Sequence, residues 1–129
     1  MASKEKNTAL IEQAKTFKNV PWCEDYEKMI SGMLFVTLEL CLPSTDESNR
    51  YDPFGPELEG GRLRARRLVK KYNDYFPDDA TPESLANDRF VMLKEIIGTV
   101  GPRTFVDPPF HVDYGCNISF GSDFYANFK

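Results

Sequence analysis

Residues 108–129 read PPFHVDYGCNISFGSDFYANFK, and this stretch decides the fold because its pattern repeats every six residues. Counted from Pro108, the blocks are PPFHVD, YGCNIS, FGSDFY and a partial ANFK. Two blocks open with an aromatic residue and a glycine, Tyr114-Gly115 and Phe120-Gly121. Each full block has a large apolar residue in its fifth position, and these are Val112, Ile118 and Phe124. A six-residue period with apolar residues at fixed positions predicts a parallel β-helix.

A β-helix needs several stacked coils, because one coil cannot bury its own interior. The chain after Pro102 provides about one coil and a fragment of the next. An unfinished stack leaves a strand edge unpaired, and such an edge promotes association. Blocks of six can also arise by chance in any strand region rich in aromatic residues, so periodicity alone leaves both explanations open.

The first third of the chain has a helical pattern. Residues 1 to 20 are polar and predict at most a frayed helix that ends before Pro21. From Trp22 to Phe35, apolar residues recur at spacings of three and four, which predicts one face of a helix. Residues 35–50 differ from both neighbours, since their first half is strand-like and their second half is a polar loop.

Two more helices are predicted between this region and the six-residue pattern. Residues 62–73 predict a basic helix. Thr81-Pro82-Glu83 is a strong helix start, because it offers a capping hydroxyl, a proline at the first helical position and an acid. The apolar side of this last helix is predicted to reach Val100, and Gly98 and Gly101-Pro102 end it.

Composition narrows the class of protein. The chain has 129 residues, a formal net charge of -4 and a sequence pI of about 5.0, so no global basic excess points to nucleic acid or an acidic membrane. Its cysteines, Cys23, Cys41 and Cys116, lack zinc spacing and indicate free thiols in a reducing compartment. The N-terminus lacks an apolar signal core, and no run is long enough to span a membrane. These features predict a soluble, cytoplasmic protein without a metal site.

Three stretches together resemble a known family: EKMISGMLF, YDPFGPELEGGRLRARRLVKKYN and PPFHVDYGCNISFGSDFYANF. They are similar to the N-terminal half of the maltose and galactoside O-acetyltransferases, which are hexapeptide-repeat acyltransferases. The resemblance implies an α+β fold, with a helical N-terminal cap followed by the first coil of a left-handed parallel β-helix in a truncated chain. It divides the chain into a polar segment at 1–21, a cap at 22–101 with an atypical insertion at 35–50, and the start of the β-helix at 102–129.

The resemblance also implies chemistry. Family members form homotrimers with active sites between adjacent β-helices, and they move an acetyl group from acetyl-CoA to a sugar hydroxyl such as that of maltose, glucose or a galactoside. A histidine removes the hydroxyl proton, and backbone donors stabilise the oxyanion. The family's catalytic histidine lies downstream of the stretches matched here. His111, the one histidine of this chain, is therefore not assigned as the base, and no catalytic residue is predicted.

The acceptor-binding residues implied by the resemblance are Asp52, Arg62, Asp113, Tyr125 and Asn127. Carboxylates and amides bond paired hydroxyls, and a tyrosine ring offers a flat face to a sugar. Structural explanations stay open for three of them. Asn127 could bond backbone at a β-helix corner, Tyr125 could serve packing alone, and Asp52 could cap the turn of YDPFG.

Several functions follow from these features. The first is a truncated sugar O-acetyltransferase, inactive as this fragment because it lacks the histidine and most of the coenzyme A site. The second is a non-catalytic cap that associates with full-length acetyltransferase trimers through its strand edge. A third, nucleic-acid binding by the basic run RLRARRLVKK, is disfavoured because a helix spreads these charges around its surface. The insertion at 35–50 is either translated intron or a loop peculiar to this protein that tunes specificity.

Overall fold

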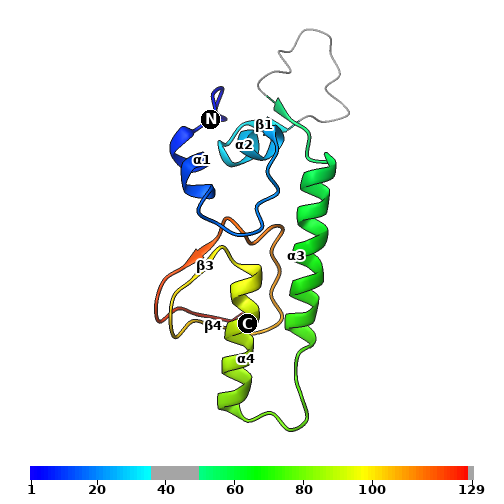
Figure 1. The fold of residues 1–129 in the computed structure, drawn as a ribbon, viewed down its shortest axis with the longest axis vertical. Coiled ribbons are helices and arrows are strands. Elements are labelled where there is room, and N and C mark those ends of the chain that lie inside the picture. Colours follow the sequence, from blue (N-terminus) through cyan, green and yellow to red (C-terminus); the bar gives the residue numbers. More distant parts are fainter. Residues whose placement is uncertain (36–49, 128–129) are drawn as a thin grey trace. The chain divides into compact units, whose positions relative to one another are not determined.

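The computed structural model describes residues 1–35 and 50–127 (Figure 1). The chain forms two compact units: residues 1–16 with 20–61, and residues 17–19 with 62–129. The long helix α3 (Pro56–Asp74) begins in the first unit and continues into the second. The predicted division into segments 1–21, 22–101 and 102–129 stays a prediction.

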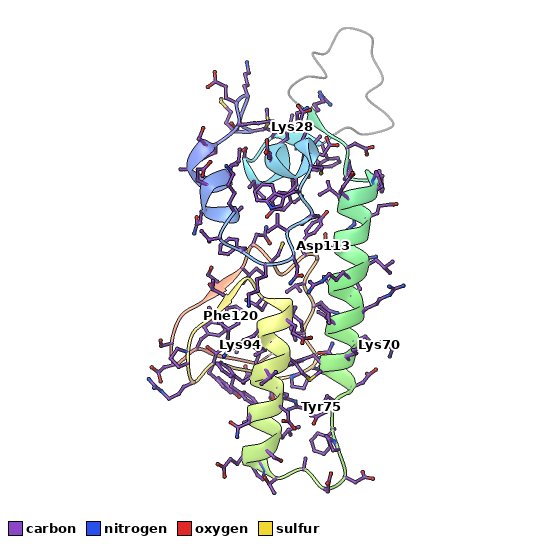
Figure 2. The ribbon with its side chains drawn as sticks, viewed as in Figure 1. Lys28, Lys70, Tyr75, Lys94, Asp113 and Phe120 are labelled. Carbon is purple, nitrogen blue, oxygen red and sulfur yellow. The ribbon has the colours of Figure 1, made fainter. Side chains whose placement is uncertain are left out.

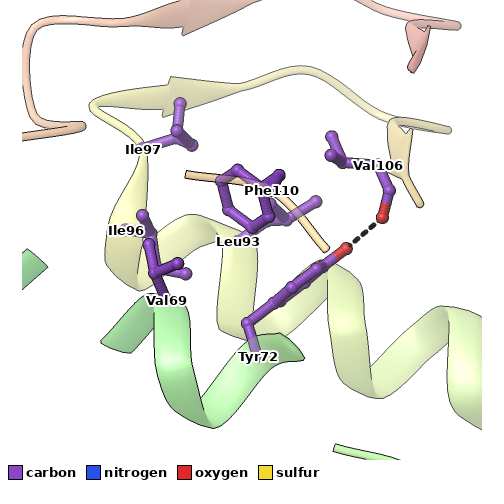
Figure 3. Close-up of a cluster of buried hydrophobic side chains, with 7 residues drawn as sticks. All are labelled: Val69, Tyr72, Leu93, Ile96, Ile97, Val106 and Phe110. Carbon is purple, nitrogen blue, oxygen red and sulfur yellow. Dashed lines mark hydrogen bonds between the residues drawn. The ribbon is translucent and has the colours of Figure 1, made fainter. Parts of the chain in front are cut away.

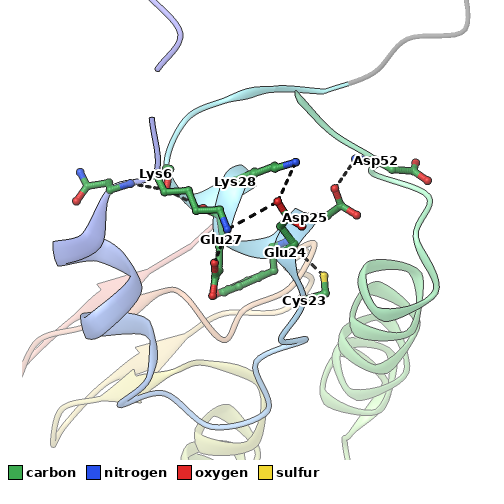
Figure 4. Close-up of polar contacts among 10 residues, drawn as sticks. Lys6, Cys23, Glu24, Asp25, Glu27, Lys28 and Asp52 are labelled. Atoms are coloured by element: carbon green, nitrogen blue, oxygen red, sulfur yellow. Dashed lines mark hydrogen bonds and ion pairs between the residues drawn. The ribbon is translucent and has the colours of Figure 1, made fainter. Parts of the chain in front are cut away.

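The first unit contains α1 (Thr8–Ala14) and α2 (Glu24–Ile30). Asn7 joins their ends, because its side chain caps α1 while its backbone N–H donates to Ser31 Oγ at 2.8 Å, beside the end of α2. Acidic residues occupy the first turn of α2, as expected for the positive end of a helix dipole. Lys6 donates to Glu27 at 2.8 Å in the same cluster (Figure 4).

The helix predicted from Trp22 to Phe35 is shorter than expected. It ends at Ile30 because Gly32 adopts a left-handed conformation with φ of 75°, which stops the helical hydrogen bonding. The chain continues as β1 (Leu34–Phe35), which pairs in parallel with β2 (Arg50–Tyr51). Most of the predicted insertion at 35–50, namely residues 36–49, lies outside the described residues.

The second unit contains the remainder of α3, then α4 (Pro82–Ile96). The start of α4 is as predicted: the Thr81 hydroxyl accepts a hydrogen bond from Ser84 N–H, and the Ser84 side chain reaches back to the cap. The helix ends just before Gly98, one of the predicted stops, but Val100 does not belong to it and lies in strand β3 (Thr99–Val100). The helix stops because Gly98 N–H turns to donate to Gly115 O at 3.1 Å, which begins strand pairing.

Three further strands follow: β4 (Phe105–Val106), β5 (Ser119–Phe120) and β6 (Tyr125–Ala126). β3 pairs in parallel with β5 and β4 with β6. Both pairings join residues twenty apart, from Thr99 to Ser119 and from Phe105 to Tyr125. Within each layer the strands start six residues apart. The short parallel strands and their six-residue spacing agree with the predicted pattern, and the coil begins before Pro102.

The core of the second unit lies between α3, α4 and this coil (Figure 3). Its buried members are Val69, Tyr72, Leu93, Ile96, Ile97, Val106 and Phe110. The three apolar residues predicted from the repeat, Val112, Ile118 and Phe124, pack against this core. The Tyr72 hydroxyl donates to Val106 O at 2.6 Å, which ties α3 to β4. Among the described residues, no helix is long and apolar enough to cross a membrane.

Candidate functional site

In the second unit, α3 contacts the loop of residues 110–114 at Phe110, Asp113 and Tyr114. Asn73 makes two hydrogen bonds to the backbone of Phe110, at 2.9 and 3.1 Å. Tyr72 meets the Phe110 ring edge-on, with centroids 5.0 Å apart. Since the amide of Asn73 both donates to the loop and accepts from it, the start of the loop has a fixed register on the helix.

Further along the loop, Arg62 meets Tyr114. One guanidinium nitrogen of Arg62 donates to the Tyr114 hydroxyl at 2.7 Å, and its central carbon lies 5.8 Å from the ring centroid. The contact combines a hydrogen bond with a cation–π approach. It orients Arg62, which the sequence assigned to acceptor binding, while Tyr114 was not predicted.

Asp113, the second predicted acceptor residue of this loop, faces Arg66 at 3.7 Å. Both side chains are about two-thirds exposed, 68% for Arg66 and 67% for Asp113, so the pair is weak and its groups stay available to a ligand. Arg62, Arg66 and Asn73 are spaced to share one face of α3. We call this surface the α3 face: Arg62, Arg66 and Asn73 with loop residues Phe110, Asp113 and Tyr114.

A pocket of about 320 Å³ adjoins the α3 face, and we call it the α3 groove. It is lined by Arg66, Val69, Lys70, Asn73, Asp74, His111 and Val112. Lys70 pairs with Asp74 at 2.6 Å. Figure 2 labels Lys70 on the helix and Asp113 on the loop beside it. The lining of the groove thus combines charged hydrogen-bond donors and acceptors with the apolar side chains of Val69 and Val112.

Tyr125 and Asn127 lie at the other end of the second unit's sequence, in and after β6. The Tyr125 side chain is 62% exposed, and its ring stacks on Phe105 with centroids 5.8 Å apart and planes 7° apart. The Tyr125 ring therefore has a packing partner in Phe105, in line with the alternative that Tyr125 serves packing alone. Asn127 is exposed. Among the described residues, no hydrogen bond or ion pair links either side chain to the α3 face.

Asp52 belongs to the first unit. Its carboxylate accepts from Phe54 N–H at 2.8 Å, and its own backbone N–H donates to Asp25 Oδ1 at 2.9 Å (Figure 4). The turn-capping role left open for Asp52 is thus present in the structure. Its assignment to the acceptor site, like those of Arg62, Asp113, Tyr125 and Asn127, stays a prediction.

Comparison with known proteins finds similar sequences among the O-acetyltransferases. Residues 49–101 match the family model described as maltose acetyltransferase hexapeptide capping motif. Sophorolipid acetyltransferase of Starmerella bombicola is 32% identical over 118 residues, which cover 89% of this chain and 39% of that protein. Galactoside O-acetyltransferase of Escherichia coli K12 is 37% identical over 91 residues, covering 68% of this chain and 42% of that protein.

The family model and the relatives support the maltose and galactoside O-acetyltransferase family for this chain. A solved structure, a galactoside acetyltransferase in complex with coenzyme A, supports the same assignment with a TM-score of 0.52 and 33% identity. The match covers 60% of this chain and 36% of the galactoside acetyltransferase chain. The family resemblance of the sequence is confirmed. The chain spans about two fifths of the length of these relatives.

Two contacts of the site escaped sequence reasoning. Arg66 follows Arg62 by one helical turn, so their common face was available from spacing, but its partner Asp113 was not. The Arg62–Tyr114 contact joins residues 52 positions apart, and no local sequence pattern predicts it. In the described residues, no group of three or more histidine, cysteine, aspartate or glutamate side chains is placed to hold a metal ion.

Proposed function

We propose that the protein containing this chain transfers an acetyl group from acetyl-CoA to a hydroxyl of a sugar such as maltose, glucose or a galactoside. The observation that carries the proposal is the α3 face, where Arg62 and Asp113 present charged groups from a fixed loop and helix. Such groups bond the paired hydroxyls of a sugar ring. Asp52, Tyr125 and Asn127 complete the proposed acceptor set.

The remaining parts of the proposal come from the family. Further coils would continue a left-handed parallel β-helix after β6, three copies would assemble, and the protein would act in the cytoplasm. The base that removes the hydroxyl proton and most of the coenzyme A site would lie in those coils. These 129 residues would then supply the acceptor side of the reaction and not its chemistry.

Sugar binding tests the acceptor side directly. Maltose and lactose are titrated into the 129-residue chain while backbone amide signals are followed by NMR. We expect shifts at Arg62, Asp113 and Tyr114, and Arg62→Ala should weaken binding about tenfold, as for a lost charge-assisted bond. Arg67→Ala is the matched control, because Arg67 is exposed on α3 outside the α3 face and groove. Shifts confined to other regions would contradict the assignment.

A turnover assay tests whether the catalytic base lies outside these 129 residues. The 129-residue chain incubated with acetyl-CoA and maltose should release no coenzyme A above the rate of spontaneous hydrolysis. A longer protein that continues into further coils with a histidine should do so. Appreciable turnover by the 129 residues would show that the proposed base outside them is not needed.

A non-catalytic module is the second candidate. Within the described residues β5 and β6 each pair on one side, so their other edges can accept a strand from another chain. The chain would then join trimers of a full-length acetyltransferase. Co-purification with such a protein, and a change in its rate, would favour this function over the first.

A further inference from the structure

Strand β3 has one edge that no strand covers in the described part of the chain, because it pairs with β5 alone. On the paired edge, Thr99 N–H donates to Ile118 O at 3.3 Å. In the same way, Gly101 N–H donates to Phe120 O at 2.9 Å. The residue between these two donors, Val100, therefore directs its backbone N–H and C=O to the opposite edge. Such an edge is a template for another strand.

Elsewhere in the first layer of the coil, α3 bonds the equivalent backbone groups. In β4, the carbonyl of Val106 accepts the Tyr72 hydroxyl at 2.6 Å. In the loop that follows, the backbone N–H and C=O of Phe110 both bond the Asn73 side chain. Among the described residues, none bonds the backbone of Val100 in this way. A further coil of the proposed full protein would cover β5 and β6 but not β3, because the chain enters the coil there directly from α4.

A pocket of about 370 Å³ lies beside β3, and we call it the β3 pocket. All of its lining belongs to the second unit: Lys18, Lys94, Ile97, Gly98, Thr99 and Val100. Both lysines are exposed, and within the described ranges no carboxylate forms an ion pair with either. The Lys94 ammonium, in the last turn of α4, lies 4.3 Å from the centre of the Phe90 ring, which orients it (Figure 2). The pocket therefore combines an open strand edge with two cations that no neighbouring acid neutralises.

These features favour a peptide over a small anion. A phosphate or a free carboxylate could accept from the lysines and from Val100 N–H, but it would leave the Val100 carbonyl without a donor. An extended peptide presents both a carbonyl and an N–H to Val100, as in strand addition at a sheet edge. Side chains at alternate positions of a strand share one face, so acidic residues two apart in the peptide would both face the lysines.

We propose that the β3 pocket is a docking site for an extended acidic segment of a partner protein, which adds to β3 as a strand and places its carboxylates against Lys18 and Lys94. The site is separate from the proposed acetyl transfer, because its lining shares no residue with the α3 face or the α3 groove. Few residues pair at so short an edge, so the docking is weak and transient. A partner held there leaves the proposed acceptor site free.

Four blocked peptides test the docking site when titrated into the 129-residue chain by NMR. They are TEVEVT, its amide twin TQVQVT, and two N-methylated forms of TEVEVT, one methylated at both glutamates and the other at both valines. TEVEVT should shift the amide signals of Gly98, Thr99 and Val100, and TQVQVT should bind about tenfold more weakly because it lacks the two ion pairs. One methylated form should keep binding and the other should lose it, because alternate N–H groups of an added strand face β3.

Variants then test the two lysines. Lys18→Gln and Lys94→Gln should each weaken TEVEVT about threefold and leave TQVQVT unchanged. Lys71→Gln is the control, because Lys71 is exposed on α3 and does not line the β3 pocket. The proposal is overturned by an absence of shifts at β3, by equal affinity for the amide twin, or by equal binding of the two methylated forms. Movement of the same signals as the chain is concentrated without peptide would place a second copy on this edge, and that also overturns it.

Discussion

At the scale of single residues, Tyr72 determines how α3 meets the coil. Its side chain is fully buried, and its hydroxyl donates to Val106 O at 2.6 Å. Its ring also meets Phe110, whose backbone Asn73 holds. One tyrosine therefore supports both the core and the loop that carries Asp113 and Tyr114.

Tyr72→Phe should destabilise the second unit by about 1–2 kcal/mol, because the buried Val106 carbonyl loses its donor while the ring packing remains. Urea unfolding followed by NMR signals of the second unit measures this. Tyr75→Phe is the control, since the Tyr75 hydroxyl bonds Asp88 at the exposed surface, and its effect should be smaller. An equal loss of stability in both variants would contradict the role given to burial.

Tyr72 also makes stability depend on alkaline pH. Burial raises the pKa of Tyr72 from 10.0 to about 12, because the charged phenolate is disfavoured in the core. Between these values the folded chain keeps a proton that the unfolded chain has lost, so stability falls as pH rises. The contribution is fully present below pH 10 and is lost toward pH 12, on the order of 2 kcal/mol. Unfolding measured at several pH values should show a shallower decline in Tyr72→Phe.

At the scale of elements, the sequence predicted what short-range patterns encode. The six-residue repeat located Val112, Ile118 and Phe124 on the core, and the Thr81 cap located the start of α4. The first layer of the coil was hidden, because Ile96, Ile97 and Val100 keep helical spacing across the end of α4. The sequence did not predict β3 because this strand depends on tertiary structure. Thr99–Val100 forms a strand since it pairs with residues twenty positions later, and local preference does not reveal that pairing.

The candidate site shows the same limit. Arg62 and Asp113 came from motifs shared with a family, each within its own stretch of sequence. Tyr114 and Arg66 act through contacts between α3 and the loop, and the chain between them is too long for any periodic signal. Residues that touch across such distances are found only once the helix and the loop have been placed.

The close stacking of the coil can be tested at Gly101. A Cβ built there would lie 2.5 Å from the backbone carbon of Gly121 in the next layer. Gly101→Ala should therefore force the layers apart and lower the free energy of unfolding by about 1–3 kcal/mol. Gly121→Ala is the matched control, because a Cβ at Gly121 meets no atom within 4 Å. Thermal unfolding that is equally affected by both would contradict the parallel register.

At the scale of the whole molecule, the described part of the coil has two layers of short strands joined by parallel pairing. In the described part of the chain, β5 and β6 are paired on one side alone, with β3 and β4. The aromatic stacks run with them, Phe105 on Tyr125 and Phe120 on Phe124. In the proposed full protein, a further coil would cover this edge and these rings.

Without that cover, the 129-residue chain should associate as its concentration rises, because an unpaired strand edge accepts strands from other chains. Sedimentation velocity over a range of concentrations measures this. Ser119→Lys places a charge on exposed β5 and should shift the mixture toward monomer. Ser122→Lys, in the exposed turn after β5, adds the same charge off the strand and should not. A chain that stays monomeric throughout would mean that the edge is closed by some other means, and the argument for a further coil would fail with it.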